Sequence, residues 1–472
     1  MTTPLRQKAL LVALQLPKVS DEEVQSSLAE LGRLVTTLGY DVIGQTSQRR
    51  SSDRNAIVVG EGKLRELALW TDGPGVVGPG FVKKKSKAAL RFTSSTDQES
   101  DTDDLNDFDD DEEMSPENHE EGPTEQTDVV VFDCDLSPSQ LRNLESALAV
   151  PVLDRTGVII EIFSRHARTP AAKLQVEIAR LTYVAPRLRE TGGGEDRGGG
   201  GVGSKGAGET SLELDRRKIR DRIKELKEEL TAISQADDVR RTRRSQEIKV
   251  ALVGYTNAGK SSLMRALTGR EVLVADKLFA TLDTTVRVLQ PESKPKILIS
   301  DTVGFIKKLP HDLVASFKST LDEAKHASLL FYVVDSSDPT FRSQLEVTRT
   351  VFAEVGATEI PSRLLLNKSD LLTPEQRHHL HEEFPEAIFL STQNAQDIAS
   401  LREHLISTFE TDMRDEDLFV PYQTQGAVGE VRAKLRVLTE TYQDQGVLFR
   451  VRGNPQDIER IKSKFQLPSV LP

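Results

Sequence analysis

Apolar and polar positions follow a strand-and-helix pattern in the first part of the chain. Short apolar runs there alternate with longer segments in which apolar residues recur every three or four positions. The short runs predict strands at 9–16, 41–44, 57–59, 129–132 and 150–153, and the longer segments predict helices at 21–38, 63–70 and 137–149. Because strands that alternate with helices form parallel sheets, we expect a small α/β domain over residues 1–170.

A helical repeat occupies residues 171–245. Apolar residues spaced four, three, four and three positions apart form two series: Leu174, Ile178, Leu181, Ala185 and Leu188, then Ile219, Ile223, Leu226, Leu230 and Ile233. This spacing is typical of the seam between two packed helices. Glycines dominate the intervening residues 191–208, so we predict an antiparallel helical hairpin with a glycine-rich loop at its tip.

The remaining chain returns to short apolar runs. Those at 248–253, 296–300 and 364–366 predict strands of a mostly parallel sheet with helices on both faces, within a domain of residues 246–412. A small α/β domain is expected over residues 413–472. Its predicted strands are 418–422 and 446–451, and its predicted helices are 429–441 and 455–465.

Acidic residues are concentrated in one segment of the first predicted domain. Residues 97–128 carry 16 acidic side chains and no lysine or arginine, so leaving them out takes the net charge from −12 to +4. With the glycine- and proline-rich residues before them they form a segment, about 71–127, without apolar periodicity. Such a segment cannot bury enough surface to fold alone. We expect a disordered insert in the first domain, with a role as an acidic mimic of nucleic acid as the alternative.

Cysteine content and hydropathy bear on where the protein works. Cys134 is the only cysteine, which excludes an intrachain disulfide and a cysteine-based metal site and fits a reducing cytoplasm. No apolar run approaches the roughly 20 residues that span a bilayer, and the first residues lack a secretory cleavage site. We expect a cytoplasmic monomer without a membrane span, with peripheral association at a membrane left open.

A phosphate-binding motif follows the apolar run 248–253. The residues Gly254, Tyr255, Thr256, Asn257, Ala258, Gly259, Lys260 and Ser261 have the spacing GxxxxGKS. Its glycines let backbone N–H groups turn toward a β-phosphate, and the N-terminus of the next helix favours an anion. We expect Lys260 to reach the β- and γ-phosphates and the Ser261 hydroxyl to bind Mg²⁺.

Two further motifs end the next apolar runs. In the first, Asp301, Thr302, Val303 and Gly304, the carboxylate can hold Mg²⁺ through water and the Gly304 N–H can contact a γ-phosphate. The second comprises Asn367, Lys368, Ser369 and Asp370. The Asp370 carboxylate can accept hydrogen bonds from the ring N–H and the exocyclic amine of guanine, donors that adenine does not offer at that edge. In this order the motifs predict a GTPase.

A switch that senses the γ-phosphate is expected between the first two motifs. Its predicted GTP contacts are Phe279, Ala280, Thr281, Leu282 and Asp283, and Ser391, Thr392 and Gln393 complete the predicted set. Thr281 is the expected second hydroxyl ligand of Mg²⁺. Lys260, Thr281 and Gly304 are the expected catalytic groups.

Two residues of the site bear on its mechanism. Phe305 follows the second motif, where many switch GTPases have a glutamine that orients the attacking water, and a phenyl ring cannot do this. Asn257 lies inside the phosphate loop, as in GTPases that use K⁺ near the phosphates. An asparagine there can equally hydrogen-bond the backbone, so both interpretations of Asn257 stay open.

Cations gather around the hairpin tip. They are Arg187, Arg189, Arg197, Lys205, Arg216, Arg217, Lys218 and Arg220. A cationic end with glycines that allow close approach suits phosphate-rich RNA, and a flexible linker between two helices is the alternative. Residues 155–168 supply further positive charge, as a surface or as a binding face.

The sequence strings GYTNAGKS, LFATLD, DTVGFI and NKSD together closely resemble those of the HflX family of translation-associated GTPases. The resemblance extends to both sides of the GTPase domain. It implies that the hairpin tip and the N-terminal domain bind the large ribosomal subunit, with ribosomal RNA near the tip. It also implies dissociation of stalled or idle ribosomes, with the nucleotide controlling binding and release. Residues 190–197 depart from the family's loop through extra glycines and through Glu195 and Asp196.

Two other functions remain to be weighed. One is a GTPase switch that acts on a non-ribosomal protein or RNA partner. The other is an RNA-remodelling ATPase, which the guanine-specific carboxylate of Asp370 disfavours.

Overall fold

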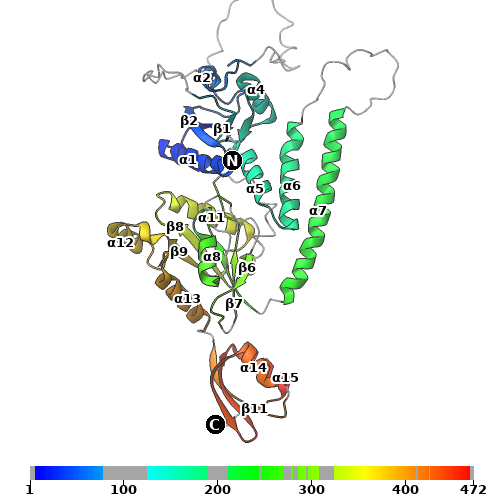
Figure 1. The fold of residues 1–472 in the computed structure, drawn as a ribbon, viewed down its shortest axis with the longest axis vertical. Coiled ribbons are helices and arrows are strands. Elements are labelled where there is room, and N and C mark those ends of the chain that lie inside the picture. Colours follow the sequence, from blue (N-terminus) through cyan, green and yellow to red (C-terminus); the bar gives the residue numbers. More distant parts are fainter. Residues whose placement is uncertain are drawn as a thin grey trace, which may run out of the picture. The chain divides into compact units, whose positions relative to one another are not determined.

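The computed structural model describes residues 6–77, 125–188, 211–243, 247–269, 278–279, 285–293, 296–307, 324–410, 413–424 and 426–467. These residues form three sheets and a helical hairpin (Figure 1). The chain divides into two compact units, Met1–Ile159 and Ile160–Pro472. The glycine-rich loop lies outside the described residues, and so does the predicted acidic insert apart from 71–77 and 125–127. The boundaries between the four predicted domains stay predictions.

The first unit contains a four-stranded parallel sheet. Its strands are β1 (Lys8–Gln15), β2 (Asp41–Arg49), β3 (Val129–Phe132) and β4 (Val152–Asp154), in the order β2-β1-β3-β4. The helices are α1 (Asp21–Thr37), α2 (Glu61–Thr71) and α4 (Pro138–Leu148). Ser20 and Ser137 begin α1 and α4 with capping boxes, which satisfy N–H groups that a helix start leaves open. The expected α/β fold is confirmed.

The predicted strand at 57–59 is wrong. Val58 and Val59 are buried in the apolar core of this unit, but they belong to no strand. The run leads directly to Gly60, which begins α2, so it supplies core side chains without sheet pairing.

The helix α5 (Arg155–His166) corrects a second expectation. Arg155 is not a surface cation, because its side chain is only 1% exposed. Its guanidinium donates to the Asp133 carboxylate at 2.6 Å and to the Glu30 carboxylate. Burial lowers the pKa of Arg155, but these two carboxylates outweigh burial and hold it above its ordinary value. Arg155 therefore joins α5 to α1 and to the residue that follows β3.

The predicted hairpin is present as α6 (Pro170–Val184), the short 3-10 helix η1 (Ala185–Arg187) and α7 (Ser211–Arg243). The helices α6 and α7 pack side by side (Figure 1). Every predicted seam residue of α7 is at least partly covered, and Leu226 is fully buried. Arg222 of α7 donates to Glu177 of α6 at 3.3 Å. The heptad spacing thus identified the packed faces.

The second sheet carries the nucleotide motifs. Its strands are β5 (Ile248–Val253), β6 (Thr285–Val288), β7 (Ile297–Asp301), β8 (Leu329–Asp335), β9 (Ser362–Asn367) and β10 (Ile388–Phe389), in the order β10-β9-β8-β5-β7-β6. Only β6 is antiparallel to its neighbour among these strands. The described helices are α8 (Lys260–Thr268), α11 (Phe341–Val355), α12 (Pro374–Glu383) and α13 (Ala395–Glu410), with the 3-10 helix η2 (Ser369–Leu371).

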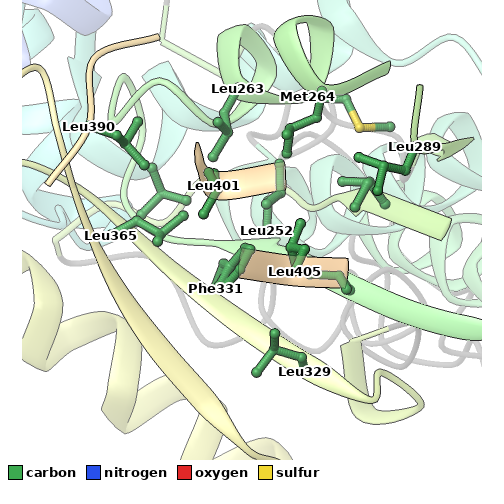
Figure 2. Close-up of a cluster of buried hydrophobic side chains, with 14 of the residues drawn as sticks. Leu252, Leu263, Met264, Leu289, Leu329, Phe331, Leu365, Leu390, Leu401 and Leu405 are labelled. Atoms are coloured by element: carbon green, nitrogen blue, oxygen red, sulfur yellow. The ribbon is translucent and has the colours of Figure 1, made fainter. Parts of the chain in front are cut away.

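One apolar core of this domain lies between the sheet and the helices α8 and α13. Figure 2 shows Leu263 and Met264 of α8 and Leu401 and Leu405 of α13 together with Leu252 of β5 and other strand residues. These side chains are all buried. The packing fixes the start of α8 relative to the strand ends, and the motifs lie at those ends.

The last sheet is antiparallel, in the order β11-β13-β12. Its elements are β11 (Arg414–Pro421), α14 (Ala427–Lys434), β12 (Arg436–Gln443), β13 (Gly446–Gly453) and α15 (Pro455–Phe465). The predicted helix 429–441 is therefore wrong in its second half, where the chain forms β12. The stretch is rich in valine, threonine and tyrosine, residues that favour strands.

Candidate functional site

The three sequence motifs meet at one edge of the second sheet. The phosphate loop 254–259 follows β5 and leads into α8, residues 301–304 end β7, and residues 367–370 end β9. These strands are parallel, so their carboxyl ends lie on the same side of the sheet, where open α/β sheets bind ligands.

The glycines of the phosphate loop are required by close contacts. Gly259 has φ of 92°, and a Cβ at this position would lie 2.1 Å from the Asn367 amide nitrogen. At Gly254 a Cβ would lie 2.2 Å from the Val333 carbonyl oxygen. Asn257 also adopts a positive φ, of 62°, which asparagine tolerates better than most residues. The loop is therefore tightly wrapped against β8 and β9.

Lys260, the first residue of α8, lies at the centre of this loop. Its ammonium donates to the carbonyl oxygens of Gly254 at 3.0 Å and Tyr255 at 2.7 Å. Burial lowers the pKa of Lys260 to about 8, and the nearby Asp301 carboxylate offsets only part of that effect. A phosphate group beside this ammonium would stabilise its charged form.

Ser261 and Asp301 form the predicted metal side of the site. The Ser261 hydroxyl donates to Asp301 at 2.7 Å, and Asp301 is fully buried. Hydroxyl and carboxylate oxygens suit Mg²⁺, which usually binds through one or two carboxylates together with waters and substrate phosphates. Among the described residues, no group of three or more His, Cys, Asp and Glu side chains forms a metal cage. The residues present therefore fit Mg²⁺ held jointly with a nucleotide.

The predicted base-binding motif is tied to the phosphate loop. The Asn367 amide donates to the Ala258 carbonyl oxygen at 2.8 Å, and Lys368 pairs with Asp335 at 2.6 Å. Asp370 lines an open cavity together with Ser369, Ser391 and Gln393. The structure thus brings Asp370, the residue assigned to the guanine ring, together with three other residues predicted to contact GTP.

Three residues of this cavity were not predicted from the sequence. Arg377, Asn394 and Asp397 line it, from α12 and from the start of α13. Asp397 accepts from the Ser391 N–H at 2.8 Å and from the Asn394 amide at 3.0 Å, so it shapes the loop that faces Asp370. None of these residues belongs to a recognisable motif, and only the sheet order shows that they face the site.

The segment after residue 304 is bonded to the phosphate loop. The Thr256 N–H donates to the Phe305 carbonyl oxygen at 2.8 Å, and the Phe305 N–H donates to the Gly254 carbonyl oxygen at 3.2 Å. The Phe305 ring is buried and lies edge-on to Phe352, with 5.5 Å between ring centroids. Phe305 is therefore a core residue, and its inability to orient water stays a prediction from its chemistry.

Several other residues that were predicted to contact GTP have side chains in other surroundings. The Thr302 hydroxyl donates to the Leu252 carbonyl oxygen at 2.8 Å, so this side chain serves the sheet. Phe279 is buried, with its ring 4.5 Å from that of Phe163 in α5. Val303 is buried, and Thr392 is partly exposed beside Ser391. The predicted residues Ala280, Thr281, Leu282 and Asp283 lie outside the described residues.

The chain matches three family profiles in succession. "GTP-binding GTPase N-terminal" matches residues 25–76 and 116–164, "GTP-binding GTPase Middle Region" matches 166–244, and "50S ribosome-binding GTPase" matches 249–368. Together with the strand–loop–helix geometry of the site, these matches define a P-loop GTPase that binds and hydrolyses GTP.

Relatives narrow this class further. A GTPase HflX from Gluconacetobacter diazotrophicus is 54% identical over 461 residues, which are 98% of this chain and 98% of that protein. GTPase HflX of Escherichia coli is 43% identical over 339 residues, 71% of this chain and 79% of that protein. The chain belongs to the HflX family of GTPases. A GTP-binding protein from Sulfolobus solfataricus, solved with GDP, is 21% identical with a TM-score of 0.41, covering 84% of this chain and 99% of that one.

Proposed function

We propose that this GTPase binds the large ribosomal subunit through its α6–α7 hairpin, and that bound nucleotide controls binding and release. Dissociation of stalled or idle ribosomes is the proposed outcome. The family profile over residues 249–368 is described as a 50S ribosome-binding GTPase, which supports this partner. The structure describes no helix long and apolar enough to cross a membrane.

The exposure of α7 is the observation that carries the proposal. Leu226 is the only buried side chain described between residues 213 and 235 of this helix. A helix of 33 residues is about 50 Å long. A helix that is polar around most of its surface buries few of its side chains in an apolar core. Such an exposed helix offers a partner a long polar surface.

The start of α7 carries the charge expected for an RNA partner. Arg216, Arg217, Lys218 and Arg220 are all exposed there, at the end next to the glycine-rich segment. Lys218 also lies 3.1 Å from Asp215, but both side chains are exposed, and such a pair contributes little. Cations of this kind bind nucleic-acid phosphates and release counterions.

The nucleotide site is proposed to work as follows. Lys260 and the loop N–H groups hold the phosphates, while Ser261 and Thr281 would bind Mg²⁺ through their hydroxyls and Asp301 would hold it through water. Mg²⁺ would neutralise charge on the phosphate oxygens. The Gly304 N–H contacts the γ-phosphate, and Asp370 selects guanine. K⁺ beside Asn257 is an additional proposal, tested by exchanging K⁺ for Na⁺ at constant ionic strength.

A co-sedimentation experiment tests the ribosomal partner. Purified large subunits are sedimented with the protein and a GTP analogue, GDP or no nucleotide. We expect the double variant Arg216→Gln/Arg220→Gln to bind more weakly and with a flatter salt dependence than the wild type. The matched control, Lys224→Gln/Lys227→Gln, removes two exposed cations farther along the same helix and should bind more like the wild type.

The two alternatives give different results. A wild type that fails to sediment with large subunits in every nucleotide state would favour a GTPase switch with a non-ribosomal partner. Equal loss in both double variants would contradict a specific role for the hairpin tip.

A further inference from the structure

Thr256 has an unusual environment within the phosphate loop. Its side chain is buried, at 7% exposure, and its hydroxyl oxygen has no hydrogen-bond partner among the described residues. The backbone N–H of the same residue is satisfied by Phe305. Buried hydroxyls almost always have a partner, because an unpaired one costs free energy. An unpaired hydroxyl in a binding loop points to a ligand group that supplies the partner.

The surroundings of Thr256 identify which ligand group this is. A Cβ built on Gly304 would lie 2.8 Å from the Thr256 methyl carbon, 2.9 Å from its Cα and 3.1 Å from the Lys260 ammonium nitrogen. The Thr256 methyl carbon and Cα and the Lys260 ammonium therefore lie close to Gly304. A phosphate-loop lysine and a glycine N–H of this kind both contact the terminal phosphate in GTPases.

The same region lacks the usual water-orienting side chain. The Phe305 ring is turned into the core against Phe352, so it offers the γ-phosphate no polar group. Tyr255 is also held away, because its hydroxyl accepts a hydrogen bond from the Lys307 N–H. Among these neighbours, the Thr256 hydroxyl is the polar side-chain group that remains unpaired.

We propose that the Thr256 hydroxyl donates a hydrogen bond to a γ-phosphate oxygen of GTP and thereby helps this site to distinguish GTP from GDP. In the GDP state the hydroxyl has no such partner. The hydroxyl keeps its proton during hydrolysis. A water oxygen bonds to the γ-phosphorus, the bond to the β–γ bridging oxygen breaks, GDP leaves with that electron pair, and the water's protons leave with the inorganic phosphate.

The test compares side chains of matched shape. Thr256→Val replaces the hydroxyl by a methyl group, and we expect about a tenfold or greater loss of affinity for a non-hydrolysable GTP analogue, with GDP affinity unchanged. The melting temperature of the nucleotide-free variant should equal or exceed that of the wild type, because valine removes an unpaired polar group. Isothermal titration and differential scanning fluorimetry measure these values on the full chain.

Serine and alanine provide a second comparison that does not depend on how valine packs. Thr256→Ser should bind the GTP analogue about tenfold or more tightly than Thr256→Ala, while the two bind GDP equally. If Ser and Ala show the same preference for GTP analogue over GDP, the proposal is wrong. It is equally wrong if valine destabilises the nucleotide-free protein and weakens both nucleotides to the same extent, since the hydroxyl would then have a structural partner.

One further variant separates this proposal from the assignment of the site. Lys260→Ala should weaken GDP and the GTP analogue together, whatever Thr256 does. If Lys260→Ala binds both nucleotides normally, the assignment of the phosphate loop itself fails. All of these measurements omit ribosomes, so they are independent of the proposed partner.

Discussion

Substitution of Gly259 by alanine tests whether the phosphate loop and the base motif are mechanically linked. The new Cβ would lie 2.1 Å from the Asn367 amide nitrogen, which now donates to the Ala258 carbonyl oxygen at 2.8 Å. Relieving this overlap requires Asn367 or the loop to move. The substitution should therefore affect the phosphate side and the base side of the site together.

The size of the effect follows from two contributions. A left-handed backbone costs alanine about 1–2 kcal/mol, and Gly259 has φ of 92°. Breaking the buried hydrogen bond between Asn367 and Ala258 adds about 1–3 kcal/mol. The sum of about 2–5 kcal/mol corresponds to a loss of GDP affinity between about 30-fold and 4,000-fold, if the loop can relax only in the nucleotide-free protein.

Gly269 supplies a matched control at the other end of α8. It also has a positive φ, of 63°, but a Cβ there would find its nearest neighbour, the Gln290 Cβ, at 3.8 Å. Gly269→Ala should lower stability by about 1–2 kcal/mol and leave GDP affinity unchanged. Titration with a fluorescent GDP and thermal unfolding separate the two effects. The reasoning is refuted if Gly259→Ala and Gly269→Ala bind GDP equally well.

Three further predictions concern single side chains. Arg155→Met leaves the Glu30 and Asp133 carboxylates buried without their cation, so it should destabilise the first unit by about 3–5 kcal/mol. Hydrogen exchange of the backbone amides in β1 and β3 measures this loss, and wild-type protection there would contradict the prediction. Burial lowers the pKa of Lys260 to about 8, and a bound phosphate favours the charged form of this lysine. GDP binding above pH 8 should therefore take up a proton, so the affinity for GDP should fall by up to about tenfold per pH unit as pH rises further. In the unfolded chain this lysine keeps its proton to higher pH, so the free energy of unfolding of the nucleotide-free protein should rise with pH over the same range. If neither GDP affinity nor this stability changes with pH, Lys260 is not buried. Asp370→Asn should weaken GTP by about 1–3 kcal/mol and favour xanthosine triphosphate, whereas unchanged selectivity would remove Asp370 from base recognition.

The features best predicted from the sequence are those in which the spacing of residues follows directly from the geometry of a turn or a helix. The GxxxxGKS spacing fixes a turn between a strand and a helix, so β5, the loop and α8 were all located before the structure. The heptad spacing likewise located the α6–α7 seam, because i, i+4 and i+7 positions lie on one face of a helix. That Phe305 does not orient water rests on the chemistry of a phenyl ring and stays a prediction.

Features that depend on distant contacts were missed. Arg155 is buried only because Glu30, 125 positions earlier, and Asp133 converge on it, and its own neighbours in sequence do not reveal this. The strand β12 was read as helix because its apolar spacing fits both periods, and pairing with β13 decides the outcome. Arg377 and Asp397 reach the base cavity through the packing of α12 and α13, which no motif records.

The rate of GTP hydrolysis with and without purified large ribosomal subunits tests the central claim most directly. Phe305 provides no group to orient water, so intrinsic turnover should be slow, and the large subunit should raise it by supplying groups in trans or by ordering the switch around Thr281. We predict that large subunits accelerate hydrolysis, that small subunits do not, and that Arg216→Gln/Arg220→Gln needs more large subunits for the same acceleration. A wild-type rate that stays unchanged while the protein sediments with large subunits would contradict the account.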